Sequence, residues 1–297
     1  MARQSMTTDG LRSVKAKIAR AAMHADTLQK SIAEFFGDED SYHVWFEGDS
    51  DRPEGSLMGQ FLKRPNFPYW GVVFGDVVHC LRSALDHIAW QCTINRQTAP
   101  DPIPDRGEWR RVAYPILTDS TRWDDNFARK LWGVPDMEAL FKAQQPFSTR
   151  PEAPEQEPLA MLEGLWNIDK HRHIHFADVQ VRLEDVTFEW RGTGRPIRAR
   201  VLSQCLHEGW ALEDSAPLAD VRFLEPVPAD RYGEMDVNRQ LASHVILEEG
   251  PPAFGEYVLK AIALMTTDVW RVVAEFQEEL GPEIFNAPER GHESAPR

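Results

Sequence analysis

Residues 72–92 read VVFGDVVHCLRSALDHIAWQC, and this stretch decides the fold of the chain. On a helical wheel with about 100° per residue, its apolar side chains fill one wide arc. The opposite arc consists of Gly75, Asp76, His79, Arg82, Ser83, Asp86, His87 and Trp90. An ordinary solvent-facing arc carries Lys and Glu, and this one carries neither. We therefore expect a long helix with one face in the core and a second face turned toward specific groups.

A second informative helix is expected from Leu159 to about Arg172. Its apolar face includes Leu162 and Leu165, and on the same face lies Asp169. A carboxylate on an apolar face is unfavourable unless a cation or a hydrogen-bond donor meets it, and Arg82 is the natural partner. The two helices are thus expected to meet at a buried or half-buried polar site. Its expected members are Arg82, Asp86, His87 and Asp169, with one or more of Lys170, His171, Arg172 and His173.

Hydrophobic periodicity divides the rest of the chain. Helical spacing over 11–36 is followed by a short strand at 42–46 and a loop at 49–68. Alternating residues over 173–249 indicate an antiparallel β-sheet, and helical spacing returns at 253–281, ending at Gly281-Pro282. The predicted fold class is α+β, mainly a helical bundle with an inserted antiparallel β-sheet. The bundle comprises residues 1–172 and the helix at 253–281, the insertion comprises 173–249, and 286–297 form a disordered tail.

Composition limits the classes of function. The chain has 297 residues, of which 42% are hydrophobic, so it can bury a core. Its net charge of −14 makes a surface that wraps duplex DNA a poor expectation. No apolar run reaches the roughly 18 residues of a membrane span, and no secretory signal is visible, so we expect no membrane partner. Three cysteines, an odd number, favour structural thiols and a cytoplasmic location.

Three stretches carry a resemblance to known proteins: GDVVHCLRSALDH at 75–87, QQPF at 144–147 and NIDKHR at 167–172. Together they resemble a family of uncharacterised bacterial and phage proteins. The first helix is in turn similar to the HEPN superfamily of small helical bundles, whose ribonucleases carry Arg, a polar residue and then His after four to six intervening positions. Arg82 and His87 fit this pattern, with four residues between them. The resemblance implies a homodimer.

The leading hypothesis is a metal-independent endoribonuclease of the toxin or phage-conflict type, with RNA as partner and no cofactor. His87 would act as general acid or base, Arg82 would stabilise the charge that develops on the phosphate, and Asp86 or Asp169 would orient them. The residues expected to contact the substrate are His79, Ser83, Lys170, His171 and Arg172. An acid-free stretch of the β block would hold the RNA backbone, or form a solvated hairpin, with Arg191, Arg195, Arg198 and Arg200.

Two alternatives stay open at this point. A metal-dependent hydrolase would use a mixed nitrogen and oxygen ligand set, composed of Asp76, His79, Asp86, Asp169 and His173. A non-catalytic binding or regulatory protein would keep the polar network as architecture only and contact a partner through a sheet edge or the histidines at 171–175. This last hypothesis predicts that the loss of Arg82 or Asp169 destabilises the fold.

Overall fold

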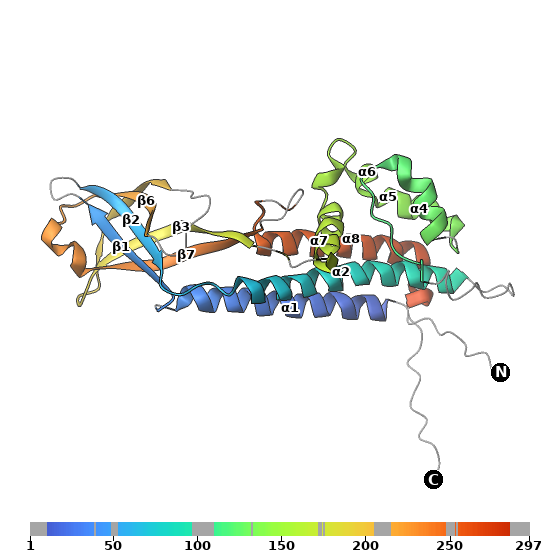
Figure 1. The fold of residues 1–297 in the computed structure, drawn as a ribbon, viewed down its shortest axis with the longest axis horizontal. Coiled ribbons are helices and arrows are strands. Elements are labelled where there is room, and N and C mark those ends of the chain that lie inside the picture. Colours follow the sequence, from blue (N-terminus) through green and yellow to red (C-terminus); the bar gives the residue numbers. More distant parts are fainter. Residues whose placement is uncertain are drawn as a thin grey trace, which may run out of the picture.

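The computed structural model describes residues 11–38, 40–48, 53–96, 110–131, 133–171, 174, 176–204, 215–247, 253 and 255–285. Three long helices lie side by side along the length of the molecule, and the strands form a separate β module at one end of them (Figure 1). The α-helices are α1 (Arg12–Gly37), α2 (Phe67–Arg96), α4 (Trp123–Lys130), α5 (Glu138–Ala143), α6 (Pro146–Thr149), α7 (Pro158–His171) and α8 (Val258–Phe285).

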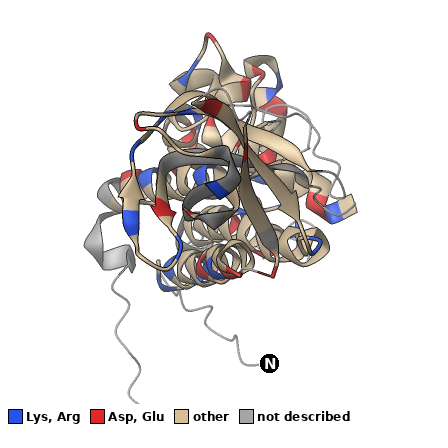
Figure 2. Cartoon of the chain, turned by 90° about the vertical axis from the view of Figure 1, so that its left-hand side faces the viewer, with Lys and Arg blue, Asp and Glu red and all other residues tan. Residues whose placement is uncertain are grey.

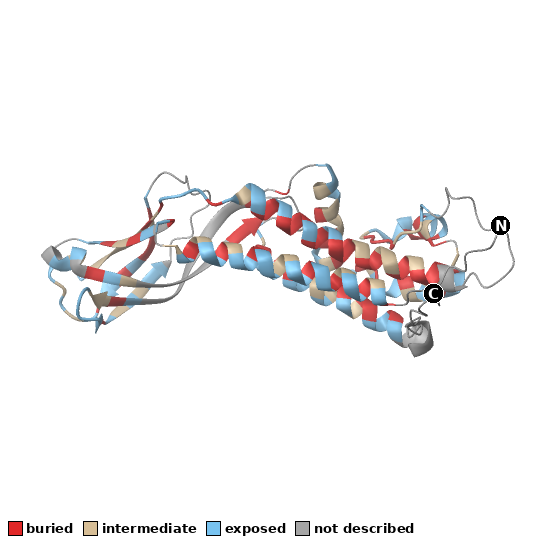
Figure 3. Cartoon of the chain, turned by 90° about the horizontal axis from the view of Figure 1, so that it is seen from below, coloured by how far each residue is buried: buried red, intermediate tan, exposed pale blue. Residues whose placement is uncertain are grey.

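The long helices meet through apolar stripes. In α1 the buried residues recur every three to four or seven positions, from Val14 and Ile18 to Leu28 and Ile32. This spacing places them on one side of the helix, so burying them holds α1 against α2. Figure 3 shows the result as buried bands that follow the facing sides of the long helices, with exposed residues on their outer sides. The core of the bundle therefore lies between α1, α2, α7 and α8.

Two antiparallel sheets make up the β module. The strands are β1 (Tyr42–Gly48), β2 (Glu54–Phe61), β3 (Phe176–Trp190), β4 (Arg195–Ile197), β5 (Ala199–Gln204), β6 (Ala216–Phe223) and β7 (Met235–Leu247). One sheet has the order β1-β2-β6-β5 and the other has the order β4-β3-β7. Aromatic rings from both sheets pack between them, with Phe46 6.3 Å from Phe188 and 4.8 Å from Phe223 between ring centroids. A 3-10 helix, η4 (Ala229–Glu234), precedes β7.

The α+β prediction is confirmed, and two of its details are wrong. The expected loop at 49–68 contains β2, whose strand pattern is obscured in the sequence by Gly55 and Gly59. Because β2 pairs with β6, the β structure extends beyond the 173–249 block. The last helix also runs past Gly281-Pro282 to Phe285, since a proline removes one main-chain hydrogen bond and a short final turn can follow it.

Other features concern the surface and the thiols. None of the helices within the described ranges is long and apolar enough to cross a membrane. Viewed from the β-module end, basic and acidic residues are interspersed, without a face of one sign (Figure 2). Cys80 and Cys92 are buried on α2 as thiols and not as a disulfide, and burial raises the pKa of Cys80. The predicted tail at 286–297 lies outside the described residues.

Candidate functional site

Arg82 lies at the centre of a polar network in the middle of α2. Its side chain is 1% exposed, and each of its three guanidinium nitrogens donates a hydrogen bond. Nε donates to Glu163 on α7 at 2.9 Å, one terminal nitrogen donates to Asp86 at 2.6 Å, and the other donates to the Tyr114 carbonyl at 2.8 Å. The guanidinium carbon also lies 4.7 Å from the centre of the Trp166 ring. Arg82 is thus enclosed, with its charge paired twice.

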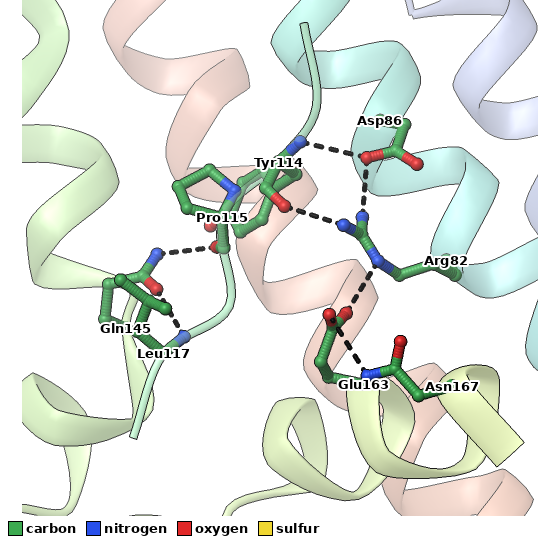
Figure 4. Close-up of polar contacts among 8 residues, drawn as sticks. All are labelled: Arg82, Asp86, Tyr114, Pro115, Leu117, Gln145, Glu163 and Asn167. Atoms are coloured by element: carbon green, nitrogen blue, oxygen red, sulfur yellow. Dashed lines mark hydrogen bonds and ion pairs between the residues drawn. The ribbon is translucent and has the colours of Figure 1, made fainter. Parts of the chain in front are cut away.

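The two carboxylates form the outer wall of this network. The Asp86 side chain is 29% exposed and the Glu163 side chain 24%, so each keeps an edge in water. Asp86 also accepts a hydrogen bond from the Tyr114 main-chain nitrogen at 2.9 Å. The segment through Tyr114 is therefore bound by both its carbonyl and its N–H to the Arg82–Asp86 pair, as Figure 4 shows.

Gln145 binds the same segment a little further along the chain. Its side chain is 0% exposed. Its oxygen accepts from the Leu117 nitrogen at 3.0 Å, and its amide nitrogen donates to the Pro115 carbonyl at 3.0 Å (Figure 4). The same amide nitrogen also donates to the Phe141 carbonyl at 3.0 Å. The segment 114–117, named here the strap, is thus fixed between α2 on one side and the α5–α6 junction on the other. The LRSALDH stretch contributes Arg82 and Asp86 to holding it, and the QQPF stretch contributes Gln145.

Asp169 was expected to pair with Arg82, and the structure places it two helical turns away. It lies against Gly75, where an added methyl group would overlap its Oδ1 atom. Gly71, one turn earlier, faces the Ile174 carbonyl in the same way, at 2.7 Å from the position of an added methyl group. These two glycines let the end of α7 and the chain beyond it approach α2 closely. Glu163, which was not among the predicted residues, takes the place of Asp169 at Arg82.

The other predicted site residues do not form one cluster. His79 is exposed, and Ser83 and His87 are half-buried on α2. Lys170 and His171 are exposed at the end of α7, where the Lys170 ammonium lies 2.7 Å from the centre of the Trp166 ring. Arg172 and His173 lie outside the described residues. The predicted polar arc of α2 is therefore split between a part that faces α7 and a part that faces water.

Two lysines lie near the Arg82 network without an ion-pair partner among the described residues. Lys130 is the last residue of α4, and burial lowers its pKa although the charges of Glu163 and Asp86 act in the opposite direction. Desolvation also lowers the pKa of Lys170, again against Glu163. Desolvation is therefore the largest influence on the pKa of both lysines beside the Arg82 network.

The ring of Tyr114 reaches a second polar cluster, on α8. Arg271 donates to Asp268 at 2.6 Å and to the side-chain oxygen of Gln144. The Tyr114 hydroxyl, one Asp268 oxygen and one Arg271 nitrogen are buried without a partner among the described residues. Burial raises the pKa of Tyr114, so the phenol keeps its proton, and the charges of Arg271 and Asp268 both act on it.

Replacing Tyr114 by phenylalanine is expected to raise the free energy of unfolding by about 1 kcal/mol, because it removes a buried hydroxyl that has no partner among the described residues. Denaturant unfolding measures the change. Tyr69→Phe, on an exposed side chain, is the matched control and should leave stability unaltered. A loss of stability in Tyr114→Phe would mean that the hydroxyl is hydrogen-bonded in solution.

Metal ligation finds no support in the part of the chain that the structure describes, where His, Cys, Asp and Glu side chains do not gather in groups of three or more. Instead, a carboxylate oxygen of Asp76 lies 3.8 Å from Nδ1 of His24 on α1.

Comparison of the chain with models of protein families, with curated proteins and with solved structures finds no match. What the chain does must therefore follow from its own geometry.

Proposed function

We propose that this chain is a non-catalytic binding or regulatory protein whose Arg82 network is architectural. The observation that carries the proposal is the enclosure of Arg82, which is 1% exposed and has all three nitrogens bonded within the chain. An arginine that stabilises a transition state must direct donors at the reacting group. To contact a phosphate, Arg82 would have to leave Glu163, Asp86 and the strap, and two carboxylates would be left without their cation.

The stretches that resemble the bacterial and phage family support the same proposal. Arg82 and Asp86 bind the main chain of Tyr114, and Gln145 binds that of Pro115 and Leu117. A network that holds a strap at several main-chain groups fixes how α2, α7 and the α5–α6 region pack together. Its residue types are those that main-chain binding requires: a planar cation, a carboxylate and an amide.

A surface hollow in the β module supplies what a binding protein needs. It lies between β1, β2, β6 and η4 and has a volume of about 660 Å³, within the range of small-molecule sites. The bundle would then act as the rigid support and the β module as the contacting part.

The test of the proposal is an RNA cleavage assay. Structured and single-stranded RNA incubated with the purified chain in EDTA should stay intact, and a His87→Ala preparation made in the same way should give identical profiles. Cleavage by the unaltered chain that disappears in His87→Ala would overturn the proposal, because a contaminating nuclease would persist in both preparations.

The endoribonuclease, with RNA as partner and a homodimer as its assembly, is the second candidate. The observation that favours it is that Arg195, Arg198 and Arg200 are exposed and have no side-chain partner in the described part of the chain. A guanidinium group without a side-chain partner can bind a phosphate and does not have to give up an existing ion pair. Arg191 differs, since it pairs with Asp236 at 2.9 Å. This candidate requires Arg82 to become accessible when RNA binds, and the cleavage assay described above decides it.

A further inference from the structure

The last long helix, α8, has an uncharged face on its solvent side in addition to the apolar face that it buries. Trp270 is 42% exposed there, and Leu259 is also exposed. At about 100° per residue, five exposed side chains fall within an arc of about 80° that extends over about four helical turns. They are Leu259, Ala263, Thr267, Trp270 and Ala274, named here the α8 outer face.

The solvent side of α1 shows what an ordinary outer face looks like in this chain. Exposed charged residues recur along it every three to six positions: Arg12, Lys15, Arg20, Asp26, Lys30 and Glu34. Single apolar residues scattered over a surface are normal, whereas an indole aligned with a leucine and small residues indicates contact with another apolar surface. Because all five side chains of the α8 outer face are exposed, the described part of the chain does not supply that surface.

A second copy of the chain fits this face by size. Consider two α8 helices that lie antiparallel and are related by a twofold axis next to Thr267. Trp270 of each copy then lies level with Ala263 of the other copy. The small side chains of Ala263 and Thr267 leave room for the indole, as holes receive knobs between packed helices.

Charge independently selects the same register. Lys260 and Glu275 are exposed near the two ends of the α8 outer face, on the same flank of it. Like flanks meet in an antiparallel pair, so a twofold axis next to Thr267 brings Lys260 of each copy level with Glu275 of the other. Among the described residues Glu275 has no ion-pair partner, and Lys260 has only Glu256 on the same helix, at 3.1 Å. Such a surface pair contributes little, so Lys260 is available to a second carboxylate.

We propose that the chain forms a homodimer through the α8 outer face, with the two α8 helices antiparallel about Thr267. The face is about 22 Å long and a helix is about 10 Å wide, so the contact is much smaller than the roughly 800 Å² that each partner contributes to a stable complex. The dimer is therefore expected to be weak, reversible and dependent on concentration. This inference goes beyond the proposed function and does not depend on it.

Sedimentation velocity of the full chain over a series of concentrations up to the millimolar range measures the association, and circular dichroism checks that each variant is folded. The unaltered chain is expected to shift from monomer to dimer as its concentration rises. Trp270→Ala should weaken the association about tenfold or more, because a central tryptophan dominates a helix contact of this kind. Met23→Ala is the matched control, since it removes an exposed apolar side chain from α1, and it should leave the association unchanged.

Charge reversal tests the antiparallel register. Glu275→Lys places like charges at both symmetry-related contacts and should weaken the association about threefold. Adding Lys260→Glu to the same chain should restore the association to within about twofold of the original, because opposite charges face each other again. Glu34→Lys makes the same reversal at an exposed position of α1 and should have no effect.

Three outcomes would overturn the inference. They are a chain that stays monomeric at millimolar concentration, equal effects of Trp270→Ala and Met23→Ala, and no recovery when Lys260→Glu is added to Glu275→Lys. A monomer would leave the α8 outer face to a partner of another kind. These outcomes leave the non-catalytic proposal standing, since that proposal fails only in the RNA cleavage assay.

Discussion

Arg82→Met is expected to lower the free energy of unfolding by about 3 kcal/mol or more. Methionine fills most of the volume but leaves Asp86 and Glu163 without their shared cation and the Tyr114 carbonyl without a donor. Removing one partner of a buried ion pair lowers the free energy of unfolding by about 3–5 kcal/mol. The lower part of that range applies here, because both carboxylates keep about a quarter of their surface in water.

Denaturant unfolding followed by circular dichroism measures this effect. Arg122→Met is the matched control, since Arg122 is exposed on the 3-10 helix before α4, and its loss should change stability by less than about 0.5 kcal/mol. If Arg82→Met unfolds at the same denaturant concentration as the unaltered chain, the Arg82 network does not have the architectural role that we propose.

A double-mutant cycle separates the contribution of the pair from that of the packing. Glu163→Gln alone should cost less than Arg82→Met, because Arg82 retains Asp86 and the strap. Combining the two changes should cost less than their sum, since the second change removes a group that the first has already left unpaired.

The sequence predicted which faces of α2 and α7 meet, and not which residues lie opposite each other. A helical wheel gives the angular position of a side chain and discards its position along the axis. Asp169 and Glu163 are six residues apart on α7, about 9 Å along the axis, and only Glu163 comes level with Arg82. The axial register is set by Gly75, which meets Asp169, and by Gly71, which meets Ile174.

The roles of Gln145 and the strap were hidden for a different reason. Gln145 recognises main-chain groups, and main-chain hydrogen bonding leaves no side-chain pattern in the strap that a sequence could display. Gly71 and Gly75 did carry a signal. They are four residues apart on one face of a helix, and the lack of side chains there indicates that another segment approaches closely. The β module was recognised from its alternation, while β2 was missed because glycines at 55 and 59 interrupt that alternation.

A second large effect is expected at Gly71, where α2 meets the chain beyond α7. Alanine is favoured over glycine inside a helix by about 1 kcal/mol, so propensity alone predicts that Gly71→Ala stabilises α2. The added methyl group would lie 2.7 Å from the Ile174 carbonyl, which is main chain and cannot move aside as a flexible side chain can. Overpacking of this kind costs about 1–3 kcal/mol and forces Ile174 away from α2. We expect a net loss of about 1–2 kcal/mol.

Gly37→Ala tests whether this loss comes from the close approach. Gly37 is the last residue of α1, and an added methyl group there meets nothing within 4 Å. The same substitution should therefore be neutral or slightly stabilising at Gly37 and destabilising at Gly71, as measured by denaturant unfolding of both variants. Stabilisation of the chain by Gly71→Ala would show that Ile174 does not approach α2 as closely as the 2.7 Å contact requires.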